Sequence, residues 1–176
     1  PYLQFSDTVV ATDFSLGYLH GCGLFENGRA RCWGDNFVAS LGSGDVSSAE
    51  YVSFETTSPV QSLIVFDGYN TCFGFEDGTV RCIGSHAGSW VVPPQEGDYG
   101  AGPSTVPAIR FSDTVPVVEL SNAAVSSCGL FANGRVRCWG NNGFHGHGRT
   151  TPVETDIATL PYIDFGTTEA VLKVFP

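Results

Sequence analysis

The sequence contains one thirteen-residue segment in three copies, each bracketed by two cysteines ten residues apart. The first copy, residues 22–34, reads CGLFENGRARCWG, and the third, residues 128–140, reads CGLFANGRVRCWG. The second copy, residues 72–84, is looser and reads CFGFEDGTVRCIG. A chain with such a repeat is built from similar structural units, so the local structure of one copy predicts all three.

Each copy is predicted to fold back on itself as a β-hairpin. In the first copy the loop Glu26-Asn27-Gly28 is typical of a type I turn closed by a glycine in the left-handed region. Pairing outward from this loop places Cys22 opposite Cys32. Opposed residues on antiparallel strands have Cα atoms about 4.5–5.5 Å apart, within the range of a disulfide. We therefore predict positive φ angles at Gly28, Gly78 and Gly134.

Three local disulfides follow from the hairpin register. Six cysteines allow fifteen pairings, but only one set follows from the same geometry in all three copies, namely Cys22–Cys32, Cys72–Cys82 and Cys128–Cys138. Nine intervening residues do not match the spacing of zinc ligands, and the chain has no C-x-x-C redox pair. The bonds are predicted to be structural, which implies an oxidising compartment and a secreted or cell-surface protein.

The composition favours an all-β globular protein. Apolar residues make up 42% of the chain, and its 22 glycines and 10 prolines favour short strands joined by tight turns. The formal charge of −10, with eight Lys and Arg, argues against a nucleic-acid partner. No apolar run approaches the ~18 residues of a membrane helix, so no membrane span is expected. The chain starts at Pro1 and lacks Met, which is typical of a processed terminus or a piece of a longer product.

The repeat also resembles a known family. Cys22 and Cys72 are 50 residues apart, Cys72 and Cys128 are 56 apart, and FSDTV begins at both Phe5 and Phe111. A period near 50 filled with short strands favours propeller blades. The pattern C-x-L-x-x-x-G-x-x-x-C-W-G-x-N, followed by spaced glycines as in CWGNNGFHGHG (138–148), resembles the RCC1 (regulator of chromosome condensation) repeat, in its cysteine-containing extracellular form. The second copy departs from the pattern, with Ile83 in place of Trp.

The resemblance implies four-stranded blades arranged as a β-propeller. The expected repeats are approximately 5–54, 55–110 and 111–164, and 165–176 is expected to be the first strand of a following repeat or a donated strand. Three blades fall short of the roughly four to eight that close a propeller, so the propeller is expected to be incomplete or completed by another chain. The nucleotide-exchange activity of nuclear family members is kept only as a remote alternative, because this chain is acidic and rich in cysteine.

Several other side chains have structural interpretations with functional alternatives. We expect the hairpin arginines to pack over glycines and Phe rings, with recognition of an acidic partner as the alternative; they are Arg29, Arg31, Arg81, Arg135 and Arg137. Trp33 and Trp139 are expected to wedge blades together, with a carbohydrate platform as the alternative. His20 is expected to pack within its strand.

No metal, cofactor or catalytic site is predicted. His145 and His147 lack a third ligand nearby and are interpreted as loop residues. Acidic residues in glycine-rich loops do not form a spaced calcium motif and are interpreted as solvated charges; they are Asp35, Asp45, Glu96 and Asp98. No Ser-His-Asp order or carboxylate pair is apparent, so no enzyme is expected. The Ser/Thr/Pro-rich segments 45–59 and 148–155 are candidates for O-linked sugars.

The C-terminal residues are predicted to mediate assembly. PYLQF at Pro1 matches PYIDF at Pro161, so the chain ends inside a repeat and leaves an apolar stretch containing Val171, Leu172, Val174 and Phe175. Unpaired strand edges and apolar faces need a cover. We therefore predict an extracellular structural module that assembles with other copies or adjacent β domains, including into a fibre. The alternative is a secreted propeller that binds a protein or carbohydrate, as an inhibitor would.

Overall fold

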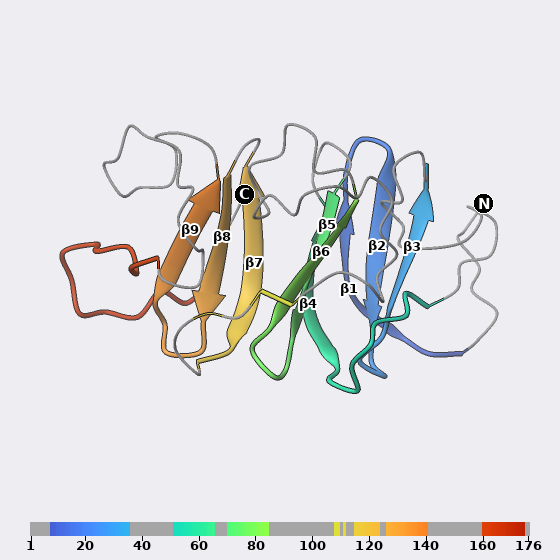
Figure 1. The fold of residues 1–176 in the computed structure, drawn as a ribbon, viewed down its shortest axis with the longest axis horizontal. Helices are drawn as coiled ribbons and strands as arrows, with labels where there is room; N and C mark the ends of the chain where they lie inside the picture. The colour runs from blue at the N-terminus through green and yellow to red at the C-terminus, as the bar shows by residue number, and fades with distance from the viewer. Residues whose placement is uncertain are drawn as a thin grey trace.

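The computed structural model describes residues 8–35, 51–65, 70–84, 108–109, 111, 115–123, 126–140 and 160–174. These ranges contain nine strands and no helix: β1 (Ala11–Leu16), β2 (His20–Phe25), β3 (Ala30–Gly34), β4 (Val60–Val65), β5 (Asn70–Phe75), β6 (Val80–Gly84), β7 (Val117–Ala123), β8 (Ser126–Phe131) and β9 (Val136–Gly140). They form three antiparallel sheets in the orders β1-β2-β3, β4-β5-β6 and β7-β8-β9. We call these sheets blades 1, 2 and 3; Figure 1 shows them side by side in chain order. The prediction of an all-β fold is confirmed.

The hairpin predicted for each cysteine repeat is confirmed, with its register. Cys22 pairs with Cys32, Cys72 with Cys82 and Cys128 with Cys138 across the two strands of each hairpin. The turn glycines Gly28, Gly78 and Gly134 have φ angles of 70°, 80° and 74°, as predicted. Asn27 stabilises its turn because its Oδ1 accepts a hydrogen bond from the Arg29 N–H at 3.1 Å.

The side chains of the first strand of a blade lie on two faces of the sheet, and each face has different surroundings. Ser15 on β1 faces blade 2, because its Oγ accepts a hydrogen bond from the Val65 N–H at 2.9 Å. Side chains alternate along a strand, so Phe14 and Leu16 face the opposite way. On the second blade the same register positions are Leu63 and Val65, since Phe14 pairs with Gly23 and Leu63 pairs with Phe73 at matching points of the two sheets.

A crossing segment carries the chain from each blade to the next. It first runs beside the third strand, where the N–H groups of Val52, Ile109 and Ile163 donate to the carbonyls of Ala30, Val80 and Val136, each at 2.8 Å. Among the described residues these contacts are isolated bridges or single bonds, and they show no regular fourth strand in a blade. The segment then reaches the following blade.

A phenylalanine in the crossing segment joins consecutive blades. The ring of Phe54 lies 4.9 Å from that of Phe73 and 5.1 Å from that of Phe75, both on blade 2. The ring of Phe111 packs in the same way on blade 3, 5.0 Å from Phe131 and 5.7 Å from Trp139. The three Phe–Phe pairs are edge-to-face, and such pairs add about 0.5–1.5 kcal/mol each to the stabilisation from burial.

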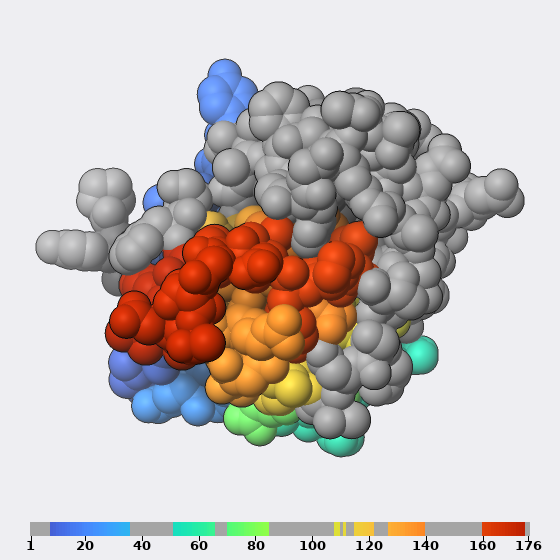
Figure 2. All heavy atoms as spheres, turned by 90° about the vertical axis from the view of Figure 1, so that its left-hand side faces the viewer, coloured from blue at the N-terminus to red at the C-terminus, as the bar shows by residue number. Residues whose placement is uncertain are grey.

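The core therefore lies between blades rather than inside one sheet. One cluster fills the interface of blades 1 and 2 and includes Leu24, Leu63 and Val65. A second fills the interface of blades 2 and 3 and includes Ile64, Leu120 and Trp139. A third lies on the far face of blade 3, where Ile163, Val171 and Val174 of the C-terminal segment pack against it. Figure 2 shows this segment wrapped over the β8–β9 hairpin.

Candidate interaction surfaces

The three disulfides lie inside the sheets as structural cross-links. Their Cα atoms are 4.0 Å apart in every pair. Cys22 and Cys72 are fully buried, and no free cysteine occurs in the chain. Each bond closes a loop within one hairpin, so it constrains a blade and leaves the blade interfaces to non-covalent packing.

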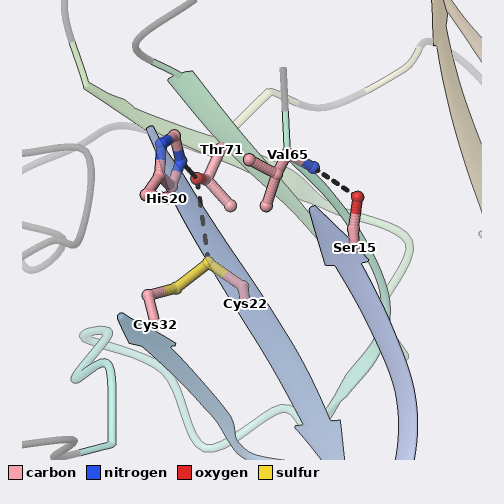
Figure 3. The surroundings of a disulfide bond; sticks show 6 residues. All are labelled: Ser15, His20, Cys22, Cys32, Val65 and Thr71. Atoms are coloured by element: carbon pink, nitrogen blue, oxygen red, sulfur yellow. Dashed lines mark hydrogen bonds between the residues drawn. A yellow bond between two sulfur atoms is a disulfide. The ribbon is translucent and has the colours of Figure 1, made fainter. Parts of the chain in front are cut away.

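A buried histidine links blade 1 to blade 2 beside the first disulfide (Figure 3). His20 Nε2 lies 2.7 Å from Thr71 Oγ1, and the same hydroxyl lies 3.8 Å from Cys22 Sγ. His20 is 4% exposed. Burial lowers the pKa of His20 to about 4, although the carboxylate of Asp35 raises it in part. The imidazole is therefore neutral at pH 7. Sequence analysis placed His20 in strand packing and missed its partner, which is 51 residues further along the chain.

The outer face of blade 1 carries large apolar side chains in solvent. Phe14 is 67% exposed and Leu16 is 62% exposed. The equivalent residues of blade 2, Leu63 and Val65, are each 6% exposed because they pack against blade 1. The first blade thus presents to solvent the kind of face that the second blade buries.

The opposite end of the array is partly covered by the chain's own C-terminal segment. Val171 and Val174, predicted to mediate assembly, are half-buried against Leu130, Val136 and Cys138 of blade 3. The Val171 N–H donates to the Gly134 carbonyl at 2.8 Å, as the Val60 N–H does to that of Gly28.

Two apolar side chains of this C-terminal segment remain in solvent. Leu172 is 90% exposed and Phe165 is 57% exposed. Phe165 follows Ile163 by two residues, as Phe54 follows Val52 and Phe111 follows Ile109, so it holds the position of the rings that pack on a following blade. Phe175, the fourth predicted assembly residue, lies outside the described residues.

Tyrosines in the crossing segments bind the hairpin arginines. The Arg29 and Arg31 guanidinium carbons lie 3.9 Å and 4.0 Å from the centre of the Tyr51 ring. Two planar groups so close to one ring centre cannot share a face, so the ring lies between them. Asn27 Nδ2 donates a hydrogen bond to the Tyr51 hydroxyl at 3.0 Å.

Blade 3 repeats this cluster. Arg135 and Arg137 lie 3.9 Å and 4.2 Å from the centre of the Tyr162 ring, and Asn133 Nδ2 donates to the Tyr162 hydroxyl at 3.2 Å. The predicted packing of arginine on Phe is also present but is longer, with Arg31 at 5.5 Å from Phe25. Sequence analysis missed both tyrosines. The shared pattern Y-x-x-F at Tyr51 and Tyr162 could have indicated them.

Of the other residues singled out in the sequence, the two tryptophans and Asp35 lie within the described residues. Trp139 is buried between blades 2 and 3, where a wedge was expected, and Trp33 is half-buried. A Cβ added to Gly21 would lie 2.7 Å from Leu16 Cδ2 and 3.0 Å from the Trp33 ring, which explains the glycine there. Asp35 is exposed at the end of β3. The loop histidines and acids fall outside the described residues; they are His145, His147, Asp45, Glu96 and Asp98.

No three His, Cys, Asp or Glu side chains in the described ranges converge as a metal site requires. Nor does any helix in those ranges have the length and hydropathy needed to cross a membrane.

Stacked sheets joined by crossing segments define a section of a β-propeller with disulfide-bonded hairpins. The Regulator of chromosome condensation (RCC1) repeat family matches residues 11–38 and 126–145. Both matched segments therefore carry repeats of the RCC1 type, and the three disulfides fit the cysteine-containing form of this repeat. No curated protein matches the sequence.

Solved structures share this fold at low sequence identity. Human WBSCR16 is similar with a TM-score of 0.68 at 15% identity over 89% of this chain. Prp20p from Saccharomyces cerevisiae is similar with a TM-score of 0.59 at 21% identity over 88% of this chain. The chain spans only 40% and 37% of the length of these two proteins. These likenesses establish the propeller fold.

Proposed function

We propose that the chain is a non-catalytic, extracellular structural module, a section of an RCC1-type propeller that assembles through its blade faces. The covering partner is a further RCC1-type blade, supplied by another copy or by an adjacent β domain. One observation carries the proposal: Phe14 and Leu16 are 67% and 62% exposed at the positions where blade 2 buries Leu63 and Val65. Burying such a side chain is worth about 1.5–3 kcal/mol, so this face favours a cover.

The interfaces between blades indicate what kind of cover fits. Within the chain, a first-strand face of this type packs against the hairpin of the preceding blade. At the other end, Phe165 holds the position of Phe54 and Phe111, whose rings pack on the following blade. Val171 bonds to the Gly134 carbonyl as the first strand of a following repeat would. Both ends therefore match a propeller blade in shape and chemistry.

Three disulfides support the extracellular part of the proposal, because such bonds persist in oxidising compartments. Assembly into a fibre extends the same proposal, since a contact between two different faces of a module continues indefinitely unless it closes a ring. O-linked sugars on segments 45–59 and 148–155 remain part of it as a prediction from composition.

A second candidate is a secreted propeller that binds a ligand with its loops. The observation that favours it is the pair of Arg–Tyr–Arg clusters on blades 1 and 3, because Arg29 and Arg135 are exposed. The two candidates are compatible, since the clusters lie at hairpin turns and the assembly faces lie at the ends of the array.

Sedimentation of the protein over a range of concentrations tests the assembly. We expect the wild-type chain to associate and the double variant Phe14→Ser/Leu16→Ser to do so at least about a hundredfold more weakly, because burying the two side chains is worth about 3–6 kcal/mol together. Tyr18→Ser is the control, because Tyr18 is also a large exposed aromatic residue but lies in the turn after β1. It should associate like the wild type.

Two results separate the sources of the covering blade. A double variant that associates as tightly as the wild type would refute the role of this face. A wild-type chain that stays monomeric would exclude other copies as the partner. In that case a longer chain with further blades should bury Phe14 without self-association, which assigns the cover to the same polypeptide.

A further inference from the structure

A small cleft opens beside the exposed guanidinium of Arg29. It has a volume of about 190 Å³, room for about six waters at their share of liquid volume. Gly28 and Arg29 of the hairpin line one side, and Ser53, Thr56 and Ser58 of the crossing segment line the other. Among the residues that the structure describes, Arg29 makes no ion pair and no side-chain hydrogen bond; Tyr51 holds its guanidinium in place by stacking. The stacking therefore fixes the orientation of its N–H groups, and none of them donates a hydrogen bond to a described residue.

The cleft offers hydrogen-bond donors and no acid. Thr56 Oγ1 accepts the Ser58 N–H at 3.1 Å, and Ser58 Oγ accepts the Asp77 N–H at 3.0 Å. A hydroxyl that accepts from the backbone keeps its own O–H to donate elsewhere. None of the described residues lining the cleft is Asp or Glu. A guanidinium fork with neighbouring hydroxyl donors suits a carboxylate, with which arginine forms charge-assisted bonds.

We propose that this cleft binds a small carboxylate that also carries hydroxyl groups, of the kind a uronic acid presents. The carboxylate lies on the Arg29 guanidinium, and the ligand's hydroxyls exchange hydrogen bonds with Ser53, Thr56 and Ser58. The site differs from the blade faces of the proposed assembly and does not depend on it.

The corresponding positions of blades 2 and 3 lack the features that we assign to the carboxylate site of blade 1. Blade 3 repeats the stacked arginine as Arg135, but its cleft of about 570 Å³ is lined by Asp164 and Glu169 where blade 1 has Ser53 and Ser58. These two carboxylates repel an anion. Blade 2 has Thr79 in place of the arginine and Ala108 in place of the tyrosine, so it lacks the stack. Blade 1 alone among the described blades combines the guanidinium with an acid-free lining.

Calorimetric titration with galacturonate at low ionic strength tests the site, with neutral galactose as the comparison sugar. We expect galacturonate to bind one site per chain and galactose to bind at least tenfold more weakly, since it lacks the charge. Equal binding of the two sugars would overturn the proposal, because the guanidinium would then contribute nothing.

Variants locate the site. Arg29→Gln should weaken galacturonate binding about tenfold or more, and Arg135→Gln, which removes an equivalent stack and the same charge, should change it less than twofold. Ser53→Asp should weaken it as Arg29→Gln does. The double variant Asp164→Ser/Glu169→Ser should create a second site. Equal losses in the two arginine variants would show a general charge effect and overturn the proposal, as would an Arg29→Gln protein that binds like the wild type.

Discussion

The buried imidazole of His20 predicts a specific loss of stability at mildly acidic pH. Its pKa is about 4 in the folded protein, against 6.5 for a solvated histidine, and burial is the main cause. Between these values the unfolded chain binds a proton that the folded chain does not, so stability falls as the pH falls. Above pH 6.5 both states are neutral and the full stability is present. Each pKa unit corresponds to about 1.4 kcal/mol, so the loss approaches 3 kcal/mol at pH 4.

The variant His20→Asn isolates this effect from other titrating groups. Asparagine stands at the equivalent position of blade 2 as Asn70, which pairs with Gly84 as His20 pairs with Gly34. It has no proton to gain in this pH range, yet it offers hydrogen-bonding groups toward Thr71. Urea unfolding of both proteins should therefore give free energies whose difference changes by about 3 kcal/mol between pH 7 and pH 4, in favour of the variant at low pH.

Parallel pH dependence of the wild type and His20→Asn would contradict this prediction. If the two proteins lose stability in parallel as the pH falls, His20 does not carry the effect and its folded-state pKa is not lowered. Carboxylates that do not interact with His20 act on both proteins alike and cancel in the difference. Near-ultraviolet circular dichroism at pH 4 checks that each protein is still folded before denaturant is added.

Two further predictions concern the hairpins. Non-reducing peptide mapping should find each cysteine linked to the one ten residues away, and a disulfide between two blades would contradict the register. The variant Cys22→Ala/Cys32→Ala should lower the free energy of unfolding by about 2.5–3 kcal/mol, the value expected from the chain entropy of an eleven-residue loop. Gly28→Ala should destabilise more than Gly166→Ala, because both have positive φ but only at Gly28 would the new Cβ lie 2.6 Å from Pro59 Cβ. Thermal unfolding measures the melting temperature of both glycine variants. Equal decreases in the two would exclude a steric contribution at Gly28.

The features predicted from sequence are those fixed within one hairpin. The turn glycines, the pairing of Cys22 with Cys32 and the all-β fold depend on residues a few positions apart, so turn chemistry and strand register suffice. The arginines were placed on their own hairpin, where Arg31 does lie near Phe25. Their closer partner, Tyr51, belongs to the crossing segment, and its position depends on how the chain returns.

The contacts that sequence reasoning missed lie between blades. The hydrogen bond of His20 to Thr71 and the packing of Phe54 on Phe73 depend on how one sheet stacks on the next. Leu63 and Phe14 occupy equivalent apolar positions in the sequence, but the sequence does not tell which of the two is covered by another blade. The C-terminal segment was expected to reach another molecule, whereas Val171 and Val174 also complement their own third blade.

The local pairing of the cysteines bears on how the chain acquires its disulfide bonds as it is synthesised. Each disulfide joins residues only ten positions apart, so both thiols of a hairpin emerge almost together and before the next pair has been made. At every moment the nearest oxidation partner is the correct one, and the fifteen possible pairings never compete. A polypeptide of such repeats can therefore be lengthened by whole blades without adding wrong pairings, and its maturation needs oxidant but little reshuffling.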